Sequence, residues 1–274
     1  MPSILLHVVP ASLYALLGAH FWHASWHKAA FERIAGIRTW ERVVLLVALL
    51  VQGIGLFRDI FPNGGMRFGF SYALPLIFWL ALLFYWIESF YARLEGLHML
   101  GLPLAAGCAL LPLAVPGQHS LLHVDSPVFR AHFLMAMLAY SSLTLAALHA
   151  LLMASVEKQL HRGRLSRALA NLPPLLTMEA LLFRLILIGF VLLTLTLGSG
   201  ILFSETLFGK ALSWDHKTVF AIASWIIFAA LLAGRHLYGW RGRQALRWTL
   251  AGFVALMLAY VGTRFVIEVV LHRG

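Results

Sequence analysis

The chain has 274 residues, of which 61% are hydrophobic and only 12% are charged, and its formal net charge is +10. A soluble domain carries roughly 25% charged residues, so this composition excludes a soluble protein and predicts a single transmembrane domain over residues 1–274. The positive charge does not indicate nucleic-acid binding, because the Lys and Arg residues are split among short loops and form no continuous patch. The single cysteine, Cys108, excludes an intramolecular disulfide and a metal site built on thiolates.

Eight runs of the sequence are long and apolar enough to cross a membrane, since a spanning helix needs about 20 mostly apolar residues. We therefore predict an all-α fold, a polytopic transmembrane bundle of about eight helices. No sheet is expected, because open sheet edges cannot lie in lipid. The predicted spans cover about 2–22, 43–61, 69–91, 97–115, 129–156, 180–203, 218–233 and 245–271, the fourth interrupted by proline.

Loop charge predicts the orientation of the bundle. Most basic residues lie in the loops after the first, third, fifth and seventh runs, and cytoplasmic loops of membrane proteins carry an excess of Lys and Arg. Both termini are therefore expected outside, on the periplasmic side of a bacterial inner membrane. The basic residues of these four loops are Lys28, Arg33, Arg38, Arg42, Arg93, Lys158, Arg162, Arg164, Arg167, Arg235, Arg241, Arg243 and Arg247.

The loop before the seventh run ends in a compact polar corner, Trp214-Asp215-His216-Lys217, which is expected on the outer side. Two interpretations are open. Asp215 is a good N-cap for the helix that follows, because an aspartate oxygen can accept from the backbone N–H groups of the first turn. Alternatively, the Trp214 indole stacks on a flat apolar ligand whose carboxylates pair with Lys217.

Two histidines are expected at the same outer depth. His132 lies just inside the fifth run, and His272 lies at the end of the eighth. Imidazoles from two different helices are what axial ligation of haem iron requires. The structural alternatives are an interfacial His132 bonded to a backbone carbonyl and a frayed, solvated terminus around His272.

Four segments together resemble a known family. They are GFVLLTLTLGSG at 189–200, WDHK at 214–217, SWIIF at 224–228 and GWRG at 239–242. Together they resemble the cytochrome c assembly superfamily of haem-handling membrane proteins (CcsA-, CcmC- and HemX-like), whose hallmark is a tryptophan-rich periplasmic WWD segment. The sequence is most similar to the small HemX/YpjD-like inner-membrane branch. The resemblance covers about 129–272, the expected cytochrome c assembly-like core.

The resemblance implies roles for the polar corner. Trp214, Asp215 and Lys217 match the end of the WWD segment, with His216 in place of a proline. The sequence also departs from the family pattern, because residues 204–213 contain no tryptophan. The family histidine near the inner end of the next helix has no counterpart in register, since His236 is displaced.

The resemblance also implies a ligand set. His132, which precedes Tyr140 in the same run, matches the external histidine before the WWD segment, and His272 matches the external histidine after it. Trp225 matches a tryptophan of the following helix. By this resemblance His132 and His272 are the metal ligands of haem b, and Trp214, Asp215, Lys217 and Trp225 contact the cofactor.

The implied function is haem handling at the outer face for cytochrome c maturation, by a binding or handover protein that is not an enzyme. The expected partners are the lipid bilayer, haem, and other maturation proteins or an apocytochrome. The alternative is a structural or regulatory subunit of an ion-transport or stress-response membrane system that has lost haem. The missing tryptophans of 204–213 favour that alternative.

Overall fold

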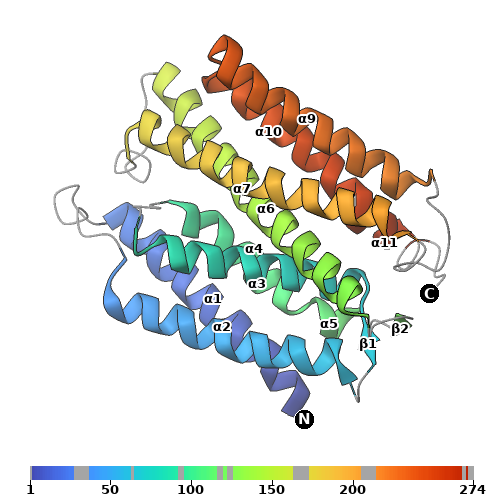
Figure 1. Ribbon diagram of the computed structural model, residues 1–274. Helices are drawn as coiled ribbons and strands as arrows, with labels where there is room; N and C mark the ends of the chain where they lie inside the picture. Colours follow the sequence, from blue (N-terminus) through green and yellow to red (C-terminus); the bar gives the residue numbers. More distant parts are fainter. Residues whose placement is uncertain are drawn as a thin grey trace.

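The computed structural model describes residues 2–27, 37–62, 65–91, 96–115, 120–121, 126–162, 173–204, 214–266 and 270. Within these residues, eight helical segments are long and apolar enough to cross a membrane (Figure 1). The predicted all-α polytopic bundle is therefore confirmed. The spans are α1 (Pro2–His27), α2 (Thr39–Ile60), α3 (Phe70–Glu88), α4 and α5 (Leu97–Ala109 and Leu111–Ala114), α6 (Pro127–His161), α7 (Leu175–Leu202), α9 (His216–Tyr238), and α10, η3 and α11 (Gly242–Met257, Leu258–Gly262 and Thr263–Phe265).

The described strands are very short and lie between spans. β1 (Met66–Arg67) pairs antiparallel with β2 (Ser120–Leu121). The two strands belong to the connections that follow α2 and α5, so no strand edge is exposed within a described span. This placement agrees with the rule that only helices and closed barrels cross lipid.

The helix ends follow local chemistry. Pro127 occupies the first turn of α6, where its missing N–H costs nothing. The predicted proline interruption of the fourth span is a break at Leu110, where α4 ends and α5 begins with Pro112 in its first turn. Gly239 ends α9 with a φ of 66°, in the left-handed region that favours glycine.

The long helix α6 is the centre of the bundle. It crosses between α1–α5 and the group formed by α7, α9 and α10, and it packs on α3 and α4 as well as on α7 and α10 (Figure 1). Every residue from Ala139 to Ala150 is buried. A helix stretch that is covered on all sides must be apolar or small all round, and this stretch consists of small, apolar and hydroxyl-bearing residues with His149 and Tyr140.

The start of α1 and the end of α11 lie at the same end of the bundle. His7, near the start of α1, bonds Asp59 at the end of α2 at 2.7 Å. Phe265, in α11, lies beside Phe70 at the start of α3, with ring centroids 5.2 Å apart. We refer to this end as the outer end and to the opposite one as the inner end, following the loop charges, so the assignment of sides stays a prediction.

Polar pairs hold α1 against α2 at three depths. They lie at the outer end, near the middle and at the inner end of the helix pair. Buried polar groups in a membrane span are satisfied by partners on neighbouring helices. The pairs are His7–Asp59 at 2.7 Å, Tyr14–Gln52 at 2.7 Å and His20–Glu41 at 3.1 Å.

Candidate functional site

His132 lies in the second turn of α6, at the outer end, and faces α7. Its Nδ1 is 2.9 Å from the hydroxyl oxygen of Ser199. A Cβ added to Gly200 would lie 3.5 Å from Cε1 of the ring. In the sequence GSG at 198–200, Ser199 therefore places its hydroxyl against the imidazole. Gly200 has no side chain, so the ring edge lies close to the backbone of α7.

The hydrogen-bond pattern defines which ring nitrogen of His132 carries the proton. The Ser199 hydroxyl donates its single hydrogen to the carbonyl of Thr196, at 3.0 Å. The same oxygen therefore accepts from His132, so the imidazole carries its proton on Nδ1. The lone pair is then on Nε2. This is the arrangement of a metal-ligating histidine, whose second nitrogen donates to a fixed acceptor.

A cation near His132 also lies beside an aromatic ring of the last span. The positive charge of Lys217, in the first turn of α9, acts on the His132 imidazole. The Lys217 ammonium also lies 5.9 Å from the ring centre of Tyr260, and the Arg264 guanidinium lies 6.0 Å from the same centre. Two cations that share one aromatic ring at the edge of a membrane span form a suitable environment for carboxylates.

Tyr260 is positioned by an irregular turn of the last span. Residues Leu258–Gly262 form the π-helical turn η3 between α10 and α11. The Thr263 hydroxyl donates to the Leu258 carbonyl, five residues back, at 3.1 Å. Single π turns inside α-helices frequently occur at functional sites. No pattern in the sequence marked this turn or the hydroxyl of Ser199, so both were missed by sequence reasoning.

The structure supports the capping role of Asp215. Its carboxylate accepts from the backbone N–H of Thr218 at 2.9 Å and from the Thr218 hydroxyl at 3.0 Å, with Asp215 as the N-cap of α9. Trp214, directly before it, is 75% exposed. The polar corner therefore starts α9 and presents an uncovered indole next to Lys217.

Trp225 lies nearer than His132 to the middle of the spans. Its indole N–H donates to the Thr194 hydroxyl of α7 at 2.9 Å, and its ring stacks on Phe190 at 5.7 Å between centroids. Thr194 precedes Ser199 on α7 by more than one helical turn. Trp225 therefore joins α9 to α7 below the level of His132.

Few described residues are buried at the outer end of this helix group. In α7 no residue after Leu193 is buried up to Leu202, and in α9 no described residue before Ser224 is buried. In α6, Phe129 is the one buried residue before Met137. The side chains around His132 are therefore partly accessible, unlike the closely packed centre of α6.

The second predicted ligand, His272, lies outside the described residues. Among the residues that are described, no group of three or more His, Cys, Asp and Glu side chains could hold a metal ion. Of the two predicted iron ligands, the described residues therefore include His132 alone.

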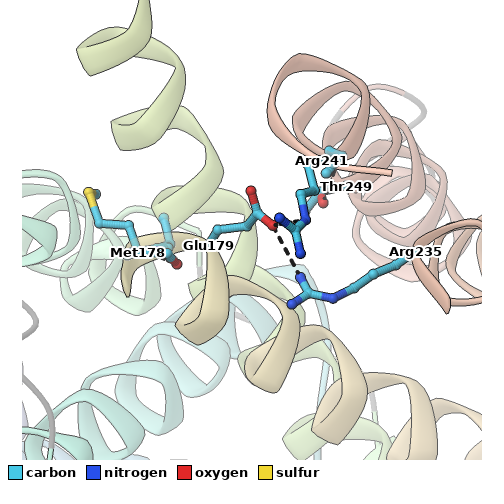
Figure 2. A network of polar contacts seen from close by, with 7 residues as sticks. Met178, Glu179, Arg235, Arg241 and Thr249 are labelled. Carbon is cyan, nitrogen blue, oxygen red and sulfur yellow. Dashed lines mark hydrogen bonds and ion pairs between the residues drawn. The ribbon is translucent and has the colours of Figure 1, made fainter. Parts of the chain in front are cut away.

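Ion pairs join the helices at the inner end. Glu88 of α3 pairs with Arg184 of α7, and Glu157 of α6 pairs with Arg243 of α10 at 2.8 Å. Glu179 of α7 faces two guanidiniums at once, those of Arg235 and Arg241 (Figure 2). Sequence reasoning treated Arg235, Arg241 and Arg243 only as an orientation signal and gave Arg184 no role, because spacing along the chain does not show which acid each of them approaches.

Comparisons with known proteins show the family of the chain. The family model described as "Cytochrome C assembly protein" matches residues 11–271. The chain is 31% identical over 239 residues to the inner membrane protein YpjD of Escherichia coli (strain K12), which covers 84% of this chain and 89% of that protein. It is 41% identical over 88 residues to the cytochrome c biogenesis protein CcsA of Prochlorococcus marinus (strain MIT 9215), which covers 32% of this chain and 28% of that protein. The chain therefore belongs to the cytochrome c assembly protein family.

Proposed function

We propose that this protein binds haem b at the outer end of the bundle and presents it there for cytochrome c maturation. The observation that carries the proposal is the hydrogen bond from His132 Nδ1 to Ser199, since it leaves the lone pair of the imidazole on Nε2. Family membership supports haem handling in general. In this proposal the protein resides in the bacterial inner membrane, where an apocytochrome or another maturation protein receives the cofactor.

The residues around His132 fit such a group. Haem would supply an iron atom that accepts axial nitrogen ligands and two carboxylates that need cationic partners. His132 would be one axial ligand, and Lys217 and Arg264 would face the carboxylates. The proposal keeps His272 as the second axial ligand and Trp214 as the exposed indole that covers the ring.

Asp215 and Trp225 have supporting roles in this proposal. The Asp215 carboxylate is engaged by Thr218, so it fixes the start of α9 and thereby the place of Lys217. The Trp225 indole is engaged by Thr194, so it holds α9 at its distance from α7. The protein would then bind and orient haem without bond chemistry of its own.

The test is the absorption spectrum of the detergent-purified protein, before and after titration with hemin. We expect a Soret band in the wild type, its loss in His132→Ala, and its return in His132→Gly with added imidazole. His161→Ala is the matched control, because His161 lies at the opposite end of α6, where its ring bonds the carbonyl of Glu157. It should keep the band.

Two results would overturn the proposal. A colourless protein that takes up no hemin would refute haem binding. An unchanged Soret band in His132→Ala would refute the assignment of His132 as an iron ligand. If the double variant His132→Ala and Trp214→Ala also supports growth as well as wild type under conditions that require the protein, the structural or regulatory alternative replaces haem handling.

A further inference from the structure

The corner between α9 and α10, at the inner end, is held by backbone hydrogen bonds and by a tryptophan packed on a glycine. Gly239 ends α9 in the left-handed conformation, and the backbone N–H groups of Gly239 and Trp240 bond the carbonyls of Arg235 and Gly234 at 3.1 and 3.2 Å. The Trp240 ring then lies on Gly234, where an added Cβ would come within 2.4 Å of it. This fold of the chain brings Arg241 back toward α7.

Two guanidiniums converge there on one carboxylate without a hydrogen bond of normal length. Arg235 NH1 lies 3.5 Å and Arg241 Nε 3.7 Å from the same oxygen of Glu179 (Figure 2). Charge-assisted bonds between such groups are ordinarily about 2.7–2.9 Å long. Arg235 NH1 is moreover buried and has no hydrogen-bond partner among the described residues. A buried donor in that state indicates a missing acceptor.

Arg235 cannot turn away to find another partner. Its guanidinium lies over the ring of Phe183, 3.6 Å from the ring centre, and Glu179 lies one turn before Phe183 on α7. Stacking on an aromatic face fixes the plane of the guanidinium. The donor is therefore held in place facing Glu179 and Arg241.

The corner carries the aromatic residues that are typical of the depth of lipid headgroups. Tyr238 and Leu237, on the last turn of α9, are 76% and 68% exposed on a helix that spans the membrane. Trp240 stacks on Tyr238 and packs against Trp248 of α10. Clusters of tyrosine and tryptophan mark the boundary between the hydrocarbon and the headgroups.

We propose that Arg235 and Arg241 form a binding site for the phosphodiester of an anionic phospholipid in the adjoining leaflet. The charges balance, because two guanidiniums face one carboxylate and one phosphodiester. A phosphate oxygen that enters beside the exposed Arg241 guanidinium gives Arg235 NH1 the acceptor that Glu179 does not provide at bonding distance. The acyl chains would lie along the exposed side of α9. This inference does not depend on haem binding.

The experiment measures binding of phosphatidylglycerol to the purified full-length protein in mixed micelles, against phosphatidylcholine at the same mole fraction. The wild type should prefer phosphatidylglycerol. Because a hydrogen bond to a charged group contributes about 1.5–3 kcal/mol, loss of one guanidinium in Arg241→Gln or in Arg235→Gln should weaken binding by about ten-fold or more.

Arg243→Gln is the matched control. Arg243 lies two residues from Arg241, and its guanidinium is already bonded to Glu157 at 2.8 Å. The Arg243→Gln variant loses the same charge from the same corner but leaves Arg235 and Arg241 in place. It should therefore keep the preference for phosphatidylglycerol. An equal loss in all three variants would show a diffuse electrostatic effect and overturn the proposal of a site.

Glu179→Gln separates the lipid site from a purely structural ion pair. With the competing carboxylate neutralised, binding of phosphatidylglycerol should become tighter. If Glu179→Gln instead lowers the thermal stability of the protein as much as Arg235→Gln does and leaves lipid binding unchanged, the cluster is a structural ion pair between α7 and α9, and the proposal is wrong. Displacement of the lipid by millimolar inorganic phosphate would also overturn the proposal, because a soluble anion would then be the ligand.

Discussion

His132 of α6 and Ser199 of α7 form a directed pair, in which the imidazole donates through Nδ1 to the hydroxyl oxygen at 2.9 Å. The direction follows from the third member, the Thr196 carbonyl, which takes the only hydrogen of the hydroxyl. Ser199 therefore acts on the site through the protonation of another residue. It is a positioning residue, and its contribution can be separated from that of the imidazole.

Removal of the Ser199 hydroxyl should weaken haem binding without removing the ligand. Ser199→Ala deprives His132 Nδ1 of its acceptor, and loss of such an outer partner typically costs 10–100-fold in metal affinity. Hemin titration followed at the Soret band measures the effect. Thr196→Val is the control, because its hydroxyl bonds the Leu192 carbonyl and its own backbone carbonyl is retained. Equal affinities in wild type and Ser199→Ala would refute the role.

Asp215 should matter as a cap rather than as a charge. Asp215→Ala should destabilise the start of α9 by about 1 kcal/mol. Asp215→Asn keeps an acceptor oxygen, so the stability of its α9 start should stay within about a few tenths of a kcal/mol of the wild-type value. Hydrogen exchange of the amides at 216–220 reports the change directly. If the Asn variant is as damaged as the Ala variant, the carboxylate charge has a use beyond the cap.

Two glycines of α7 should respond oppositely to the same substitution. A Cβ on Gly189 would lie 2.6 Å from two carbons of Leu143, whose side chain is fully buried, while a Cβ on Gly198 would meet nothing within 4 Å. Gly189→Ala should cost about 1–3 kcal/mol through overpacking of α6 on α7. Gly198→Ala should be neutral or stabilising by up to about 1 kcal/mol, because alanine favours the helix. Unfolding in detergent with denaturant gives both values, and a neutral Gly189→Ala would contradict the close approach.

Trp225 and Thr194 should be energetically coupled. In a double-mutant cycle with Trp225→Phe and Thr194→Val, we expect a coupling of about 0.6 kcal/mol, the average for hydrogen bonds between membrane helices. The phenylalanine can keep the contact with Phe190, so the cycle isolates the indole N–H. The Soret band of Trp225→Phe should match that of wild type. A lost band with no coupling would instead make Trp225 a cofactor contact.

The outer site was only partly predictable. The sequence marks Trp214-Asp215-His216-Lys217 and His132 as unusual polar residues near the ends of apolar runs, and Asp215 is found as a cap, since capping depends on residues three apart. Ser199 and Tyr260 carry no such signal, and Arg264 stands out only as a charge within the eighth apolar run. Their importance comes from being opposite His132 or Lys217, and contacts between separate helices have no fixed spacing in the sequence.

The sequence by itself determined the eight spans and offered Asp215 as a cap for α9. Bilayer thickness sets the length of an apolar run, and caps are local. Only the tertiary structure decided that α6 lies between the two helix groups, that Ser199 directs the proton of His132, and that Glu179 faces Arg235 and Arg241. The physical reason is that every span is apolar nearly all round, so hydrophobicity places each helix in the membrane without selecting its neighbours. Close packing and the pairing of a few polar groups make that selection.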